Sequence, residues 1–146
     1  MDVCIQNKQT DLSINLSKIP SIVEQVITFE RQKCDEVEIH FVDKNTIASL
    51  HDQYFNDPTP TDCISFPLDG EECSHYRHMG IVVVCPQVAV EYAKDQSLDP
   101  QRETILYLVH GLLHLIGYDD QSDKDRMIMR QSEKMNMEML EEKKLL

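Results

Sequence analysis

The segment HGLLHLIGYDD (110–120) carries two histidines four residues apart, then a glycine and an aspartate at intervals of three residues. On a helix, His110 and His114 lie one turn apart, and both can direct a ring nitrogen at a point about 2.0 Å away, as Zn²⁺ requires. Gly117 can adopt the positive φ that folds the chain back, so that Asp120 returns its carboxylate to the same point. These residues predict a three-ligand metal site with an open fourth position, an arrangement more common in catalytic than in structural sites.

The same spacing outlines the metzincin protease signature, H-E-x-x-H-x-x-G-x-x-H. Those proteases carry, after the first histidine, the glutamate that deprotonates a metal-activated water, whereas this chain has Gly111. Peptide hydrolysis is therefore not expected, and the proton acceptor must come from elsewhere, such as a substrate phosphate oxygen. The simpler alternative is a pair of hydrogen-bonded buried histidines, with Asp119 and Asp120 as turn residues before the next helix.

A long helix is needed to position the two histidines. Residues 99–117 predict a buried helix, because apolar side chains point in nearly every direction around its axis. Asp99 is the expected N-terminal cap and Gly117 the expected end. The polar positions form one narrow stripe, which comprises Glu103, Tyr107, His110 and His114.

The remaining segments predict a sheet and more helices. Strands are expected at 2–6, 36–42, 62–68 and 80–85, and helices at 19–33 (opened by Ser17 and Pro20), 44–55, 86–96 and about 122–140. The run 81–85 is apolar on both alternating faces, so its strand should be central. We expect one domain over residues 1–146 with an α+β fold. It should have a mixed sheet of about four strands packed with about five helices, and the metal site at the end of the buried central helix.

The composition narrows the expected partners. A net charge of −12 argues against nonspecific electrostatic binding of nucleic acid, because phosphates are bound by Lys and Arg. Local basic residues could still contact phosphate, and the candidates are Lys124, Arg126, Arg130 and Lys134 in the last helix and Arg77 in an earlier loop. The five cysteines form no CxxC pair, so reduced thiols are expected. With neither a signal-peptide pattern nor an apolar run of about 20 residues, we expect a cytoplasmic protein with no membrane contact.

Several motifs together resemble the YbeY endoribonuclease family. HGLLHLIGYDD matches ten of the eleven positions of that family's H-G-x-L-H-L-x-G-Y-D-H signature. Upstream, PTDCISFP (60–67) is close to the family's P-T-D-V-L-S-F-P. GIVVVCP (80–86) corresponds in position to the family's G-D-I-V-I-x-P. Downstream, Met129 and Glu133 match an M-x-x-x-E pair. The similarity covers roughly residues 37–140, and the combination of motifs is highly specific.

The resemblance implies a metal-dependent endoribonuclease that cleaves single-stranded RNA, matures the 3′ end of 16S rRNA and checks the small ribosomal subunit. It implies one Zn²⁺ per chain, with His110 and His114 as ligands. Asp120 stands where the family has its third histidine, and its carboxylate can also bind zinc. As substrate-binding candidates we name residues of the cleft and of the basic segments, namely Thr61, Asp62, Ser65, Arg77 and Lys124.

Three departures from the family pattern bear on activity. Asp120 adds one negative charge to the ligand set, which should make the metal a weaker Lewis acid. The family has a basic residue after a tyrosine, and this chain has Phe55 at that position, after Tyr54. A phosphate-binding role there does not carry over. The acid of the G-D-I-V-I motif falls at Ile81, so a role for that carboxylate is lost as well.

Two other functions remain open at this stage. The first is a non-catalytic ribosome-assembly factor in which the metal stabilises the helix-to-helix turn, a reading that Phe55, Ile81 and the acidic charge favour. The second takes two histidines and a carboxylate as the facial triad of an Fe(II) oxygenase. Those ligands normally come from a β-barrel, whereas this chain offers a buried helix.

Overall fold

The computed structural model describes residues 1–68 and 75–146, and its elements follow the predicted order. The strands are β1 (Asp2–Lys8), β2 (Glu36–Val42), β3 (Cys63–Pro67) and β4 (His78–Val84). The helices are α1 (Ile19–Phe29), α2 (Lys44–Phe55), α3 (Pro86–Gln96), α4 (Pro100–Ile116) and α5 (Asp123–Glu142), with a short 3₁₀ turn, η1 (Leu16–Lys18), before α1. A mixed sheet packed with helices confirms the predicted α+β class.

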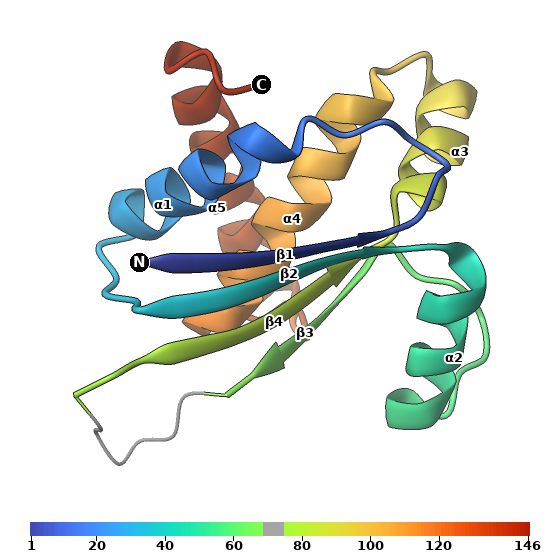
Figure 1. Ribbon diagram of the computed structural model, residues 1–146, viewed down its shortest axis with the longest axis horizontal. Helices are drawn as coiled ribbons and strands as arrows, with labels where there is room; N and C mark the ends of the chain where they lie inside the picture. Colours follow the sequence, from blue (N-terminus) through green and yellow to red (C-terminus); the bar gives the residue numbers. More distant parts are fainter. Residues whose placement is uncertain (69–74) are drawn as a thin grey trace.

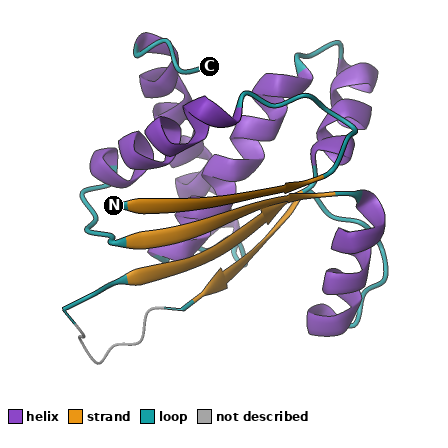
Figure 2. Ribbon diagram, viewed as in Figure 1, coloured by secondary structure: helices purple, strands orange, loops and turns teal. Residues whose placement is uncertain are grey.

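The four strands form one twisted sheet in the order β1-β2-β4-β3 (Figure 1). β1, β2 and β4 are parallel, and β3 is antiparallel to β4. β4 is therefore an internal strand, as its two apolar faces predicted. Helices α1, α4 and α5 lie on one side of the sheet and α2 lies beyond its other side (Figure 2).

Each side of the sheet has its own apolar cluster. Val37, Ile39 and Phe41 of β2 point into the larger cluster with α1, α4 and α5, and all three are fully buried. On the other side, Val83 of β4 packs with Ile47 of α2 in the smaller cluster. The larger cluster is the one against which the histidine-bearing helix is held.

Helix α4 runs through the middle of the larger cluster and is buried on most of its circumference. Its ends are those that the sequence predicted. The Asp99 carboxylate accepts a hydrogen bond from the backbone N–H of Gln101, and Gly117 ends the helix with φ 118°. Ser122 caps α5 in the same way, by accepting from the N–H of Asp125.

Helix α1 begins at Ile19 as predicted, but its cap and its C-terminal end differ from the prediction. It stops at Phe29 rather than near residue 33, because Arg31 takes a left-handed conformation with φ 58° and Gln32 N–H closes back onto the carbonyl of Ile27. Ser17 is not its cap, since it lies in η1 and its hydroxyl donates to the side chain of Asn15. A left-handed helix end without glycine gave no signal in the sequence.

Within residues 1–68 and 75–146, none of the helices is both long and apolar enough to cross a lipid bilayer.

Candidate metal centre

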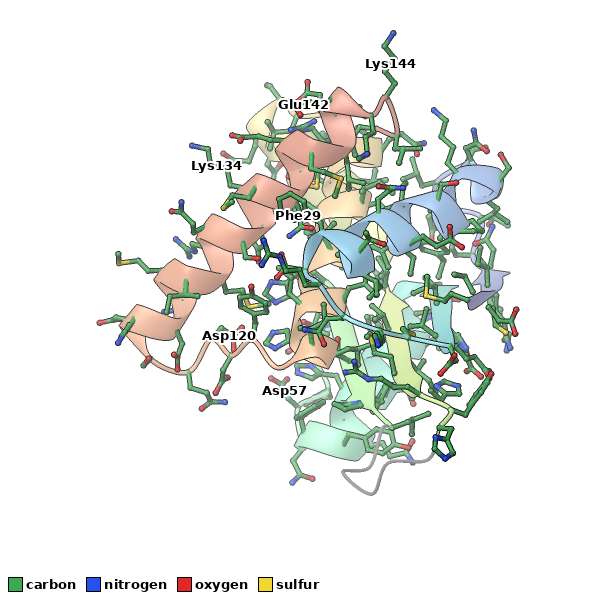
Figure 3. All side chains as sticks on the ribbon, turned by 90° about the vertical axis from the view of Figure 1, so that its left-hand side faces the viewer. Phe29, Asp57, Asp120, Lys134, Glu142 and Lys144 are labelled. Carbon is green, nitrogen blue, oxygen red and sulfur yellow. The ribbon has the colours of Figure 1, made fainter. Side chains whose placement is uncertain are left out.

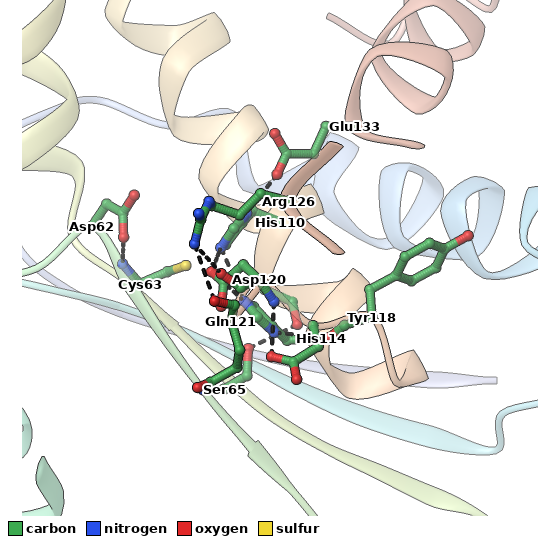
Figure 4. Close-up of polar contacts among 12 residues, drawn as sticks. Asp62, Cys63, Ser65, His110, His114, Tyr118, Asp120, Gln121, Arg126 and Glu133 are labelled. Carbon is green, nitrogen blue, oxygen red and sulfur yellow. Dashed lines mark hydrogen bonds and ion pairs between the residues drawn. The ribbon is translucent and has the colours of Figure 1, made fainter. Parts of the chain in front are cut away.

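The two histidines lie on the last turns of α4, and Asp120 lies in the loop that follows (Figure 4). The Nε2 atoms of His110 and His114 are 3.1 Å apart. Oδ2 of Asp120 is 3.8 Å from Nε2 of His110 and 3.4 Å from Nε2 of His114. Ligands held 2.0–2.1 Å from a tetrahedral ion lie about 3.3 Å from one another. The three donor atoms therefore fit the coordination sphere of a zinc-like ion as they stand.

The second ring nitrogen of each histidine fixes its tautomer. Nδ1 of His114 is 3.0 Å from the carbonyl oxygen of Tyr118, which can only accept, so this nitrogen carries the proton. Nδ1 of His110 is 2.5 Å from a carboxylate oxygen of Glu133 on α5. In the neutral imidazoles both Nε2 atoms then keep their lone pairs and face each other. Metal-binding histidines are oriented by second partners of this kind.

Nearby carboxylates set the protonation of His110. Burial lowers the pKa of His110, whereas the hydrogen bond and the charge of Glu133 raise it. Asp62 and Asp120 add negative charge nearby, and the net pKa of the imidazole is raised. Because a proton and a metal ion compete for the same nitrogen, metal affinity should increase as the pH rises through this pKa.

Glu133→Gln tests the orienting role of this carboxylate. We expect metal affinity to fall about 10- to 100-fold, the usual cost of losing an outer partner of a metal-binding histidine. The pKa of His110 should also fall, because the hydrogen bond and charge that raise it are weakened, so the pH range of metal binding should shift downward. Zinc titrations at several pH values measure both effects.

Glu138→Gln on the exposed side of the same helix is the matched control and should leave both quantities unchanged. An affinity in Glu133→Gln equal to that of the wild type would contradict the orienting role.

The loop that carries Asp120 is fastened at two points. The Tyr118 hydroxyl donates to the Glu30 carboxylate at the end of α1, with an O···O distance of 2.5 Å. That carboxylate also accepts from Ser132 and Asn136 of α5, at 3.1 and 2.9 Å. Arg126 donates to the carbonyl oxygen of Asp120 at 3.2 Å. Glu30 thus connects α1, α5 and the metal-site loop, a role that sequence reasoning missed because its partners are about a hundred residues away.

Gly111 allows α4 to lie directly against the sheet. A Cβ atom at this position would lie 2.4 Å from Cγ1 of Val82 and 3.2 Å from Oγ of Ser65. The Ser65 hydroxyl donates to the Gly111 carbonyl at 2.8 Å, which holds the helix on β3. The glutamate that serves as the base in metzincins would therefore not fit at this position. The packing thus agrees with the expectation that the chain is not a peptidase of that type.

Two clefts meet at the candidate metal site. The first, of about 510 Å³, runs toward α2 and is also lined by His51 and Phe55. The second, of about 690 Å³, runs between α3 and α5 and is also lined by Tyr92. Both are lined by Thr61, Asp62, His110 and Asp120, so the two clefts adjoin at the candidate metal site and together form a groove around it. We call this the metal-site groove.

The substrate-binding candidates lie in different places. Thr61 and Asp62 line both parts of the metal-site groove, and Ser65 lines the first part while its hydroxyl is bonded to α4. Arg77 and Lys124 are not among the described lining residues of the groove. The Arg77 guanidinium instead donates to the Gln32 side chain and to a backbone carbonyl after α1, at 3.2 and 2.8 Å. The structure therefore brings together three of the five candidates.

Other potential ligands among the described residues are less suitable. Burial holds the pKa of the Cys63 thiol well above its ordinary value, and the Asp62 carboxylate adds to this, so the thiolate that binds metals is disfavoured. A second group, Glu36, Glu38 and His78, lies on neighbouring strands β2 and β4. It is outside the metal-site groove, and its members pair with one another at 3.2 and 3.7 Å across the strands.

Comparison with known proteins gives one family. Residues 4–141 match the sequence model of the family described as Endoribonuclease YbeY. The chain is similar to a protein of that name from Protochlamydia amoebophila, with 54% identity over 139 residues that cover 95% of this chain and 93% of the relative. Proteins of the same name from Chlamydia felis and Chlamydia trachomatis are 37% and 35% identical and cover 97% and 96% of this chain, and 92% and 88% of their own lengths.

A solved structure supports the same fold. The solution structure of a protein from Thermotoga maritima superposes with a TM-score of 0.64 and 25% sequence identity. The match covers 94% of this chain and 87% of that one. The arrangement of sheet and helices that carries the candidate metal site is thus similar in that protein.

Proposed function

Because the chain belongs to the YbeY endoribonuclease family, we propose that it is a metal-dependent endoribonuclease that cleaves single-stranded RNA. The observation that carries the proposal is the convergence of three donor atoms in an open groove, with both imidazoles held in the metal-binding tautomer. This convergence supports a metal site built from residues of the family's signature.

The chain's own residues have distinct tasks in this proposal. His110, His114 and Asp120 would hold one Zn²⁺, which when bound supplies a Lewis acid for a phosphoryl oxygen and an activated water. Glu133 and the Tyr118 carbonyl keep the imidazoles oriented. Thr61 and Asp62 would contact the RNA strand where the two parts of the groove meet. The Asp62 carboxylate is held there by the backbone N–H of Cys63, at 2.7 Å.

We further propose that the substrate is a precursor of 16S rRNA and that the protein acts on the small ribosomal subunit in the cytoplasm. This part rests on the resemblance of the signature motifs to the family's pattern. A single strand is the expected ligand because the groove is lined by polar side chains and aromatic rings, which can contact phosphates and unpaired bases. A ligand set on a helix and a loop favours zinc over iron in this proposal.

Metal removal and restoration test the proposal. The purified protein should contain about one zinc per chain and cleave a single-stranded oligoribonucleotide. Treatment with a chelator should abolish cleavage, because the Lewis acid and the activated water both depend on the bound ion. Added Zn²⁺ should restore cleavage. Metal analysis and gel separation of end-labelled RNA give the two readouts.

The alternative is a non-catalytic assembly factor, favoured by Phe55 at the family's basic position and by the net charge of −12. It predicts a protein that binds zinc and the small subunit but leaves the RNA intact after zinc is restored. Iron at about one ion per chain in anaerobically purified protein would contradict the zinc assignment.

A further inference from the structure

Each half of the metal-site groove presents one exposed aromatic ring. Phe55, at the end of α2, is 58% exposed and lines the first cleft. Tyr92, on α3, is 49% exposed and lines the second cleft beside Leu106. The metal-site residues His110 and Asp120 line both clefts and so lie between the two rings. Figure 3 shows Asp120 in the loop that precedes α5.

Phe55 differs from its neighbour Tyr54 in what covers it. Tyr54 is 56% exposed but packs edge-on against Phe66 of β3, with ring centroids 5.0 Å apart, and is not among the lining residues of either cleft. Phe55 has the tilted imidazole of His51 beside it, with centroids 5.7 Å apart. His51 is itself held in place, because its Nδ1 lies 2.7 Å from the carbonyl oxygen of Thr59. One face of the groove therefore has an aromatic surface on a fixed support.

The charges of the groove are unfavourable for binding phosphates. Among its described lining residues, the acids are Asp62, Glu103, Asp119, Asp120 and Glu133, and the bases are Arg126 and Arg130. Arg126 is already engaged with two backbone carbonyls and with the Asp123 carboxylate. Ionic attraction depends on Lys and Arg, so it supplies little of the affinity for RNA in this groove.

We propose that Phe55 and Tyr92 are stacking platforms for RNA bases on the two sides of the metal centre, and that stacking rather than ionic attraction holds the strand. The inference rests on the proposed function for the identity of the ligand. Aromatic rings accept every base and require unpaired ones, because a base in a duplex has no free face. The platforms would therefore select single-stranded RNA and place the intervening phosphate at the metal site.

Binding of two probes of equal charge tests the proposal. One is a fluorescein-labelled octamer of adenylate, and the other is an octamer of abasic ribose phosphates. The full-length protein is kept in a chelator so that the RNA stays intact, and binding is followed by fluorescence anisotropy. We expect the adenylate octamer to bind at least about 25-fold more tightly, since there are two rings and stacking on one is worth about 5- to 150-fold. A smaller preference would overturn the proposal, as would the absence of binding.

Substitutions then assign the effect to the two rings. Phe55→Leu and Tyr92→Leu should each reduce the preference for adenylate about 5-fold or more while leaving binding of the abasic octamer unchanged. Tyr54→Leu is the matched control, on the same helix and with the same exposure, and should keep the full preference. An unchanged preference in either groove variant, or an equal loss in the control, would overturn the assignment.

Salt dependence provides a second readout. Even if both groove arginines contacted phosphates, the logarithm of affinity should fall with the logarithm of salt concentration with a slope no steeper than about −1.4. A steeper slope would show that phosphates carry the binding. Cleavage by the zinc-restored protein is scored separately: stacking without cleavage contradicts only the proposed nuclease, and cleavage without a base preference contradicts only the platforms.

Discussion

The His114→Ala protein is expected to lose its metal site and, with it, RNA cleavage. Loss of an outer partner already weakens metal binding 10- to 100-fold, so removing a donor should weaken it by more than about 100-fold. An ion present at 100 times its Kd stabilises the wild type by about 2.7 kcal/mol. The same concentration should stabilise the variant by no more than about 0.4 kcal/mol. Denaturant unfolding with and without zinc measures the difference.

His40→Ala is the matched control for this substitution. His40 is a partly buried histidine on β2, where its ring lies 3.3 Å from the Glu38 carboxylate and outside the metal-site groove. It should keep the full zinc-dependent stabilisation and the cleavage rate. If His114→Ala retained either one, the metal centre would be misplaced. If the metal-free variant and the metal-free wild type have similar unfolding free energies, the loss is one of binding rather than of folding.

The second large effect is expected at Asp120, and its neighbour provides the comparison. Asp120→Ala removes the third donor and should weaken zinc binding by more than about 100-fold. The Asp119 carboxylate instead accepts a hydrogen bond from the backbone N–H of Asp120 at 2.8 Å. Asp119→Ala should therefore weaken zinc binding by only a small factor. Calorimetric zinc titration of the two variants separates them. Equal losses, or a larger loss in Asp119→Ala, would show that Asp119 rather than Asp120 binds the ion.

Asp120→His addresses the charge of the ligand set. A histidine there should still bind zinc and would remove one negative charge from the ion's surroundings. The ion should then be a stronger Lewis acid, and cleavage should reach half of its plateau at a lower pH than in the wild type. A pH profile of the cleavage rate provides the comparison, and an unchanged profile would show that the carboxylate does not tune the ion.

Local rules were enough to predict α4 and its two histidines. The cap at Asp99, the glycine end and the periodicity of the polar stripe all act within a few residues, so each leaves a mark in the sequence. The same reasoning predicted that Gly117 would return the chain, and Asp120 does lie within 3.8 Å of both imidazoles.

Contacts between distant segments had no such mark. The hydrogen bond from His110 to Glu133 spans 23 residues, and the bond from Tyr118 to Glu30 spans 88. The motif match singled out Glu133 without indicating what it touches. Arg77 was grouped with the site by charge alone, whereas the fold directs its guanidinium to the end of α1. Charge shows which residues could bind phosphate, but tertiary packing decides where they lie.

The position of Glu133 on α5 also imposes an order on events during protein synthesis. The last strand of the sheet ends at Val84, whereas the residue that orients His110 is added 49 positions later. At 5–20 residues per second, this interval lasts roughly 2–10 s. A nascent chain can therefore complete its sheet well before α5 exists to hold the imidazole. Completion of the sheet and orientation of His110 are thus separate events in time during synthesis.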